Sequence, residues 1–193
     1  MFNVKSKIEN HESLIGIIGL GYIGLPLAIR FAEEGFKTIG FEIEKEKVDM
    51  LNSGKSYIKH IKDEDIAAMA NNGFIATINF SEIKNADVII ICVPTPLGIH
   101  NEPDLSFITN TLNAIKPSLR KNQLLILEST SYPGTSEEIL VPFVQSVIDP
   151  SPKVYRESID KSDLKEKSLF TIGENFFIGY SPEREDPGNN KYT

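Results

Sequence analysis

Short apolar runs alternate along most of the chain with stretches in which apolar residues recur every three or four positions. The first pattern is typical of buried strands and the second of amphipathic helices. The predicted strands span residues 14–18, 37–41, 74–78, 87–93, 123–127 and 175–180. The predicted helices span residues 22–34, 44–53, 63–72 and 105–119, with a helical turn from Ser81, its expected N-cap, and a further helix around Leu140 and Val144.

This alternation indicates parallel βαβ units and therefore an α/β fold. The run from Asp87 to Val93, DVIIICV, is almost continuously apolar and β-branched, as in a central strand covered on both faces. We therefore expect a Rossmann-type, doubly wound, mainly parallel sheet with helices on both faces.

The stretch from Leu14 to Leu27, LIGIIGLGYIGLPL, combines a strand, a glycine turn and the start of a helix. Gly19, Gly21 and Gly24 have the GxGxxG spacing of a dinucleotide-binding turn. The first glycine permits the sharp turn, the second permits close approach of a pyrophosphate, and the third permits close helix packing. A turn that serves only packing is the alternative.

Two further features favour a dinucleotide. The backbone N–H groups near Tyr22 and Ile23 are predicted to point at the phosphates from the positive end of the helix dipole. Glu42 ends the strand Lys37–Phe41, where an acidic residue binds the ribose diol of NAD. Its charge would repel the 2′-phosphate of NADP, so the sequence favours NAD.

Composition and charge argue against nucleic acid and membranes as partners of this protein. The chain has 193 residues, 40% of them hydrophobic and 24% charged, with a net charge of −7 that argues against nucleic acid as a partner. The apolar runs are far shorter than the ~18 residues of a membrane span, so no membrane partner is expected. The single cysteine, Cys92, fits a reducing cytoplasm, and the expected location is cytoplasmic.

Two segments are expected to lie apart from the sheet. Residues 1–13 are polar and predict a tail or a short helix outside the fold, which leaves 14–193 as the domain. Residues 149–174 are rich in charged side chains and predict a solvated surface excursion.

Ligands of open parallel sheets bind beyond the carboxyl ends of the strands. Four unusual segments are predicted there: the glycine turn, VPTP at 93–96, ESTSYPGT at 128–135, and SPEREDPG at 181–188. Proline-rich loops of this kind are rigid and suit the positioning of a cofactor and a substrate, although each taken alone is also compatible with a simple turn.

In this order and spacing, five segments resemble the N-terminal NAD domain of the UDP-glucose/GDP-mannose dehydrogenase family: GLGYIGLPLA, FEIEKEKVDMLNSGKSYIKHI, CVPTPL, ESTSYPGT and SPEREDPG. Within this family, the segments ESTSYPGTSEE and YSPEREDPGN are most similar to those of the UDP-N-acetylglucosamine 6-dehydrogenases of bacterial polysaccharide synthesis. The resemblance implies that the C6 alcohol of a UDP-sugar is oxidised to the carboxylate in two steps. Two NAD are consumed, and a cysteine holds the intermediate.

The resemblance also implies roles for individual residues. The implied cofactor-binding residues are Gly19, Gly21, Tyr22, Ile23, Gly24, Glu42, Thr95 and Thr130. Thr130 would also orient a catalytic water, and Glu183 would position or activate that water, so these two are the expected catalytic residues.

The family's nucleophilic cysteine, its central helix and its UDP-sugar-binding domain correspond to sequence beyond Thr193. The resemblance therefore implies that this chain alone is inactive, and that the longer protein binds the UDP-sugar and forms a homo-oligomer. Cys92 is expected to be a small core residue, and the scattered histidines predict no metal site.

Two other functions remain open at this point. One is a stand-alone NAD(H)-binding module without catalysis. The other is an NAD dehydrogenase of the hydroxyacid type, although ESTSYPGT is not expected in the substrate loops of such an enzyme.

Overall fold

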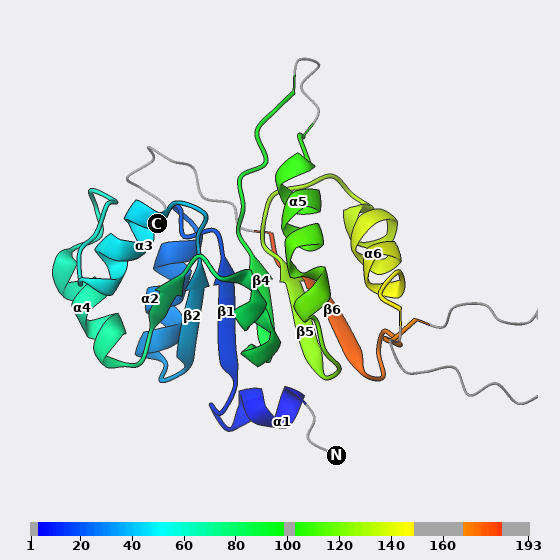
Figure 1. Cartoon of the computed structure of the whole chain (residues 1–193), viewed down its shortest axis with the longest axis horizontal. Helices are drawn as coiled ribbons and strands as arrows, with labels where there is room; N and C mark the ends of the chain where they lie inside the picture. The colour runs from blue at the N-terminus through cyan, green and yellow to red at the C-terminus, as the bar shows by residue number, and fades with distance from the viewer. Residues whose placement is uncertain (1–3, 99–102, 149–167, 183–193) are drawn as a thin grey trace, which may run out of the picture.

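The predicted alternation of strands and helices is present in the computed structural model, which describes residues 4–98, 103–148 and 168–182 (Figure 1). The strands are β1 (Leu14–Ile18), β2 (Lys37–Phe41), β3 (Ile75–Thr77), β4 (Val88–Ile91), β5 (Gln123–Leu127) and β6 (Phe176–Tyr180). The α-helices are α1 (Val4–Glu9), α2 (Gly24–Glu33), α3 (Lys45–Asn52), α4 (Asp63–Asn71), α5 (Ser106–Ile115) and α6 (Val141–Gln145). Tighter or wider helical turns are η1 (Phe80–Asn85), η2 (Lys116–Ser118) and η3 (Ser136–Leu140).

The six strands form one sheet in the order β3-β2-β1-β4-β5-β6, and every neighbouring pair is parallel. The chain moves outward from β1 to β3, crosses back to β4 beside β1, and then moves outward to β6. The carboxyl ends of β1 and β4 therefore flank the switch point at which such sheets bind ligands. The expected doubly wound α/β fold is confirmed.

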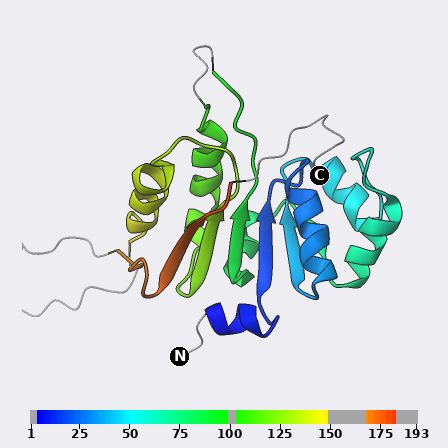
Figure 2. The ribbon, with the colours of Figure 1, turned by 180° about the vertical axis from the view of Figure 1, so that it is seen from behind.

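Side chains of the central strands alternate between two cores, one on each face of the sheet. In β4, Val88 and Ile90 pack with residues of α2, α3 and α4, whereas Ile89 and Ile91 pack with residues of α5 and α6. Figures 1 and 2 show α2 and α5 on opposite faces. Burial on both faces explains why β4 reads as a continuous apolar run and shows no alternation.

Local chemistry shifts several element boundaries. The side chain of Asn79, not Ser81, caps η1 by accepting a hydrogen bond from the Ser81 N–H at 3.2 Å. Pro117 lies in the first turn of η2, so the helix predicted over 105–119 is divided into α5 and η2. Helix α2 begins at Gly24, two residues later than predicted.

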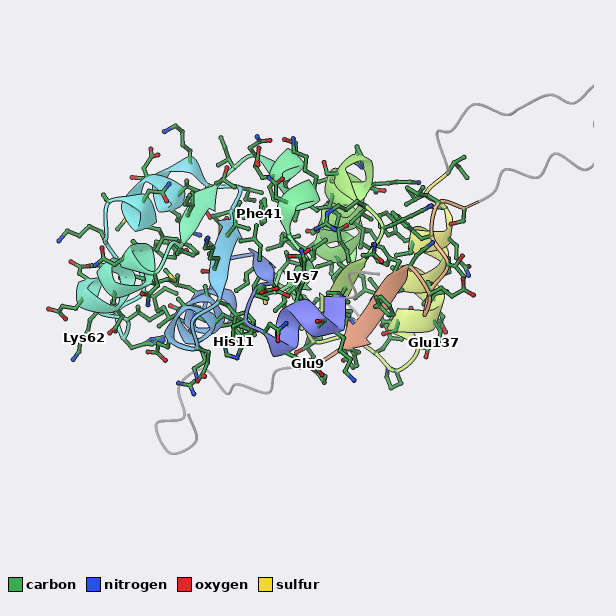
Figure 3. The ribbon with its side chains drawn as sticks, turned by 90° about the horizontal axis from the view of Figure 1, so that it is seen from below. Lys7, Glu9, His11, Phe41, Lys62 and Glu137 are labelled. Carbon is green, nitrogen blue, oxygen red and sulfur yellow. The ribbon has the colours of Figure 1, made fainter. Side chains whose placement is uncertain are left out.

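Residues 1–13 were expected to form a tail or a short helix outside the fold. A short helix is present, α1, but it is packed against the fold at the amino ends of the strands (Figures 1 and 3). Val4 is buried in the core that contains α2, and Lys7 Nζ lies 2.8 Å from a carboxylate oxygen of Asp87. A buried side chain and an ion pair therefore hold α1 against the sheet.

The expectation of a solvated excursion over 149–174 is wrong for its last residues, while 149–167 lie outside the described part of the chain. Phe170 is buried, and its ring centroid lies 4.6 Å from that of Phe176 in β6. Leu169 and Ile172 pack against the same core. Apolar contacts therefore hold the segment before β6 against the core.

Within the described ranges, no helix combines the length and apolar character needed to cross a membrane.

Asp87 links three elements at the amino edge of the sheet. Burial by itself raises the pKa of a carboxyl group, but hydrogen bonds from Lys7, Arg120 and the Leu14 N–H outweigh burial and lower the pKa of Asp87 below its usual value. A folded-state pKa below the unfolded-state value stabilises the protein above about pH 4, and this contribution is lost as the pH falls further.

We expect Asp87→Asn to lower the free energy of unfolding at pH 7 by about 2–3 kcal/mol, because it leaves two cations without their shared partner. The difference from the wild type should shrink between about pH 5 and pH 2 in urea titrations. Asp49→Asn, which breaks only an exposed pair with Lys45, is the matched control and should change little. Equal losses in both variants, or a difference independent of pH, would contradict the assignment.

Candidate functional site

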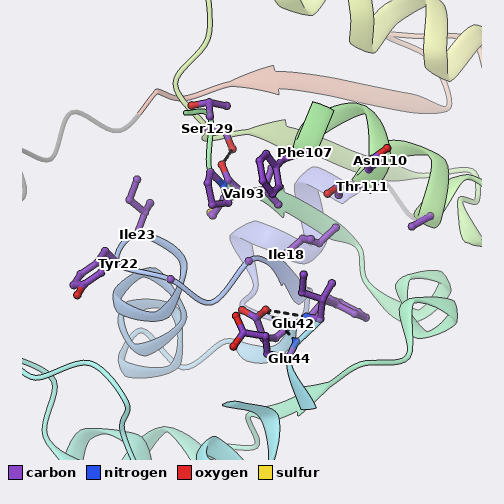
Figure 4. Close-up of a pocket in the computed structure, with 18 of the residues that line it drawn as sticks. Ile18, Tyr22, Ile23, Glu42, Glu44, Val93, Phe107, Asn110, Thr111 and Ser129 are labelled. Carbon is purple, nitrogen blue, oxygen red and sulfur yellow. Dashed lines mark hydrogen bonds between the residues drawn. The ribbon is translucent and has the colours of Figure 1, made fainter. Parts of the chain in front are cut away.

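A cavity of about 730 Å³ lies at the switch point, beyond the carboxyl ends of β1, β2, β4 and β5. Its lining joins the glycine turn, the end of β2, the segment after β4, the start of the 128–135 loop and one side of α5. The volume is within the ~300–1,000 Å³ typical of small-molecule sites. Figure 4 shows these elements around the cavity.

Gly19 makes the turn at the end of β1. Its φ is +88°, and a Cβ there would lie 2.8 Å from the carbonyl oxygen of Cys92 in the neighbouring segment. Its N–H donates to the carbonyl of Phe41 at 2.9 Å, so the turn is tied to the end of β2. Both conformation and space require glycine at this position.

Gly24 and Gly21 differ in what surrounds them. A Cβ on Gly24 would lie 1.9 Å from the carbonyl oxygen of Gly19, so α2 rests directly on the turn. A Cβ on Gly21 would meet nothing within 4 Å, although Gly21 lines the cavity. Nothing in the described fold requires glycine at 21, and the open space is what a closely bound pyrophosphate would need.

Glu42 lies at the end of β2 with its carboxylate at the cavity wall (Figure 4). The residue is only 8% exposed. One carboxylate oxygen accepts from the Leu20 N–H at 3.2 Å, and the other accepts from the N–H groups of Ile43 at 2.8 Å and Glu44 at 3.4 Å. A carboxylate has about four acceptor positions, so it retains capacity for a ribose hydroxyl on the oxygen that faces Leu20.

The two threonines named from the sequence, Thr95 and Thr130, line the same cavity from different strands. Buried Ser129 joins their segments, because its hydroxyl donates to the Val93 carbonyl at 2.7 Å. Ser129 was not predicted from the sequence. Its position soon after β5, beside Thr130, was the available clue, but its partner Val93 lies in the segment that follows another strand, β4.

Helix α5 forms a wall that the sequence analysis also missed. Phe107, Asn110, Thr111 and Ala114 line the cavity, and they recur at helical spacing. Together with Ile18, Phe41 and Phe80 they make this side largely apolar, as a flat aromatic base requires. The sequence predicted the helix but not that one of its sides faces a cavity.

The structure therefore brings together all the cofactor-binding residues named from the sequence except Gly24, which acts beneath the turn. Tyr22 and Ile23 lie at the start of α2, at the cavity edge. Glu183 lies outside the described residues, so its role stays a prediction.

Cys92 lines the cavity but has the environment of a core residue. Burial, and then the carboxylate of Glu128, raise the pKa of its thiol to about 12. A neutral thiol is a poor nucleophile, so this environment does not suit covalent catalysis. Among the described residues, no group of three histidine, cysteine or acidic side chains has the arrangement of a metal site.

The two glycines give a direct test of this geometry. We expect Gly24→Ala to lower the free energy of unfolding by about 3 kcal/mol or more, because its Cβ would overlap the Gly19 carbonyl. Gly21→Ala, the matched control, should remain within about 0.5 kcal/mol of the wild type. Thermal and urea unfolding measure both; similar stability of the two variants would show that α2 is not in such close contact with the turn.

The chain is similar to known proteins along nearly its whole length. Residues 13–192 match the model of the UDP-glucose/GDP-mannose dehydrogenase family, NAD binding domain. The chain is 31% identical over 178 residues to the UDP-N-acetyl-D-glucosamine 6-dehydrogenase of Pseudomonas aeruginosa, covering 92% of this chain and 37% of the relative. It is 35% identical over 191 residues to the UDP-N-acetyl-D-mannosamine dehydrogenase of Methanococcus aeolicus, covering 96% and 37%.

Among solved structures, the UDP-N-acetyl-mannosamine dehydrogenase Cap5O from Staphylococcus aureus superposes with a TM-score of 0.72 at 28% identity, covering 89% of this chain and 37% of that one. The chain thus spans 37% of the length of each of these three relatives. The match extends over nearly all of the sequence, including the glycine turn and the segments after β4 and β5. The chain belongs to the UDP-glucose/GDP-mannose dehydrogenase family and corresponds to its NAD-binding domain.

Proposed function

We propose that this chain binds NAD in the cavity at the switch point, with the adenosine ribose at Glu42 and the pyrophosphate over the glycine turn. The observation that carries the proposal is the Glu42 carboxylate, which is buried at the cavity wall and held by three backbone N–H groups. A fixed carboxylate accepts hydrogen bonds from a ribose diol and repels a 2′-phosphate. This arrangement supports NAD over NADP.

The residues fit the rest of the dinucleotide. The open position beside Gly21 leaves room for phosphate oxygens, and the start of α2 supplies N–H groups and a positive dipole. The apolar wall of α5 suits a base, while Thr95 and Thr130 would lie beside the nicotinamide half. When bound, NAD would supply a hydride acceptor at that end of the cavity.

We further propose that the full-length protein oxidises the C6 alcohol of a UDP-N-acetylhexosamine to the uronic acid, with two NAD reduced per sugar, for surface polysaccharide synthesis. The names of the relatives support this substrate class, and UDP-N-acetylglucosamine is the first candidate. Thr130 would orient the water that hydrolyses a thioester intermediate, and Glu183 would position or activate that water.

The second oxidation needs a thiol to hold the aldehyde carbon, and Cys92 does not suit this role because burial keeps its thiol neutral. In this proposal the nucleophile and most of the sugar site belong to sequence outside this chain. The chain alone should then bind NAD without turnover. The alternative is an NAD(H)-binding module without catalysis.

Calorimetric titration of this chain with NAD and NADP tests the cofactor proposal. We expect saturable NAD binding, at least tenfold weaker NADP binding, and no measurable NAD binding by Gly21→Val, whose side chain fills the pyrophosphate space. Glu42→Ala should weaken NAD by roughly tenfold to a hundredfold, because charged hydrogen bonds to the ribose are lost. Glu42→Gln keeps the side-chain length and one acceptor oxygen, and is the control that isolates the loss of the charge.

Two results would refute this proposal. One is a folded wild-type chain that binds neither dinucleotide; the other is NAD binding that Gly21→Val leaves unchanged.

The activity proposal is tested with the protein expressed from its gene up to the natural stop codon. With UDP-N-acetylglucosamine we expect two NADH per sugar oxidised and a UDP-uronic acid as the product, followed by absorbance and mass spectrometry. The matching N-acetylmannosamine, N-acetylgalactosamine and glucose nucleotides establish the specificity. NAD binding without NADH formation on any of these sugars would favour the binding module.

A further inference from the structure

The loop between α3 and α4, residues 53–62, lies against the glycine turn. Ile58 and Ile61 are buried and anchor this loop in the core that contains α2. Tyr57 lies between the loop and the turn, and its hydroxyl donates a hydrogen bond of 2.5 Å to the carbonyl oxygen of Leu20.

Leu20, between the first two glycines, is therefore held on both sides of its backbone. Its N–H donates to Glu42 at 3.2 Å, and its carbonyl accepts from Tyr57. One partner comes from the end of β2 and the other from the 53–62 loop. Two side chains distant from each other in sequence thus fix two successive peptide planes of the turn.

These two hydrogen bonds also determine where the Gly19 carbonyl and the Gly21 N–H point. In a trans peptide the carbonyl and the following N–H point opposite ways. The Leu20 N–H points at Glu42, so the Gly19 carbonyl points away from Glu42, and it lies beneath Gly24 as the clash at that position shows. By the same rule, the Gly21 N–H points away from Tyr57.

We infer that Tyr57 is a positioning residue for the dinucleotide: by holding the Leu20 carbonyl, its hydroxyl aims the Gly21 N–H toward the space that the pyrophosphate would occupy. This inference rests on the proposed NAD function. Tyr57 is not among the residues that line the cavity, so it acts through the backbone of the turn. Gly21 does line the cavity, with open space on its Cβ side.

The surroundings keep Tyr57 a hydrogen-bond donor. Burial, then the carboxylates of Glu42 and Glu44, raise the pKa of its phenol above the ordinary value. The hydroxyl therefore stays protonated at neutral pH. Lys47 Nζ lies 5.5 Å from the centre of the Tyr57 ring and also pairs with Glu44, so the ring keeps its contacts if only the hydroxyl is removed.

The test is Tyr57→Phe, which removes the hydroxyl and keeps the ring. We expect the affinities for NAD and ADP-ribose, measured by calorimetry, to fall about tenfold, because one N–H is no longer aimed at charged phosphate oxygens. The affinity for adenosine, measured by NMR titration, should stay within twofold because adenosine carries no phosphate. Ser53→Ala removes another hydroxyl of the same loop, one that donates to the Met50 carbonyl at 2.8 Å, and is the control with no expected change.

A second measurement needs no ligand. In the free chain, Tyr57→Phe should shift the amide resonance of Gly21 strongly and that of Gly19 little. Unchanged NAD affinity, an equal loss of adenosine affinity, or an unmoved Gly21 amide would each overturn the inference. A wild-type chain that binds neither NAD nor ADP-ribose would instead refute the proposed function, and the amide shift would still decide whether Tyr57 orients the turn.

Discussion

The contact between α2 and the glycine turn is the constraint on which the site depends. Because Gly24 has no side chain, the helix rests on the Gly19 carbonyl, and its first N–H groups come to the edge of the cavity. Leu20, fully buried between the first two glycines, anchors the turn in the core. A bulkier residue at 24 would lift the helix, and the dipole and N–H groups would then be displaced from any ligand in the cavity.

The opposite edge of the sheet is fixed by different chemistry. There Asp87 gathers Lys7, Arg120 and the Leu14 N–H, so charge and hydrogen bonding join α1, β1, β4 and the segment before β5. The ligand edge is held by backbone contacts and by neutral donors such as Tyr57 and Ser129, beside the ion pair Lys47–Glu44. Among the described residues no cation pairs with Glu42, so its carboxylate is available for a ligand.

Much of the fold was predictable because it follows from local pattern. The bounds of β1, β2 and β5 agree with the predicted strands, since each run has the length and apolar content of a buried strand. The glycines and Glu42 were also identifiable from motif spacing, and Thr95 and Thr130 were named from the family resemblance. Ser129 and Tyr57 were not, because each acts through a backbone carbonyl that is distant in sequence, 36 and 37 residues away. The position of α1 depends likewise on a partner 80 residues away from Lys7.

Burial of Cys92 has a chemical consequence under the proposed function. An enzyme that forms an aldehyde must confine the reaction of that aldehyde to one thiol, and a second reactive thiolate near the nicotinamide would compete for it. Cys92 lines the cavity, yet its pKa of about 12 leaves almost no thiolate at neutral pH. The apolar strand environment and the neighbouring Glu128 carboxylate thus give a small core residue that packs against the turn without taking part in the chemistry beside it.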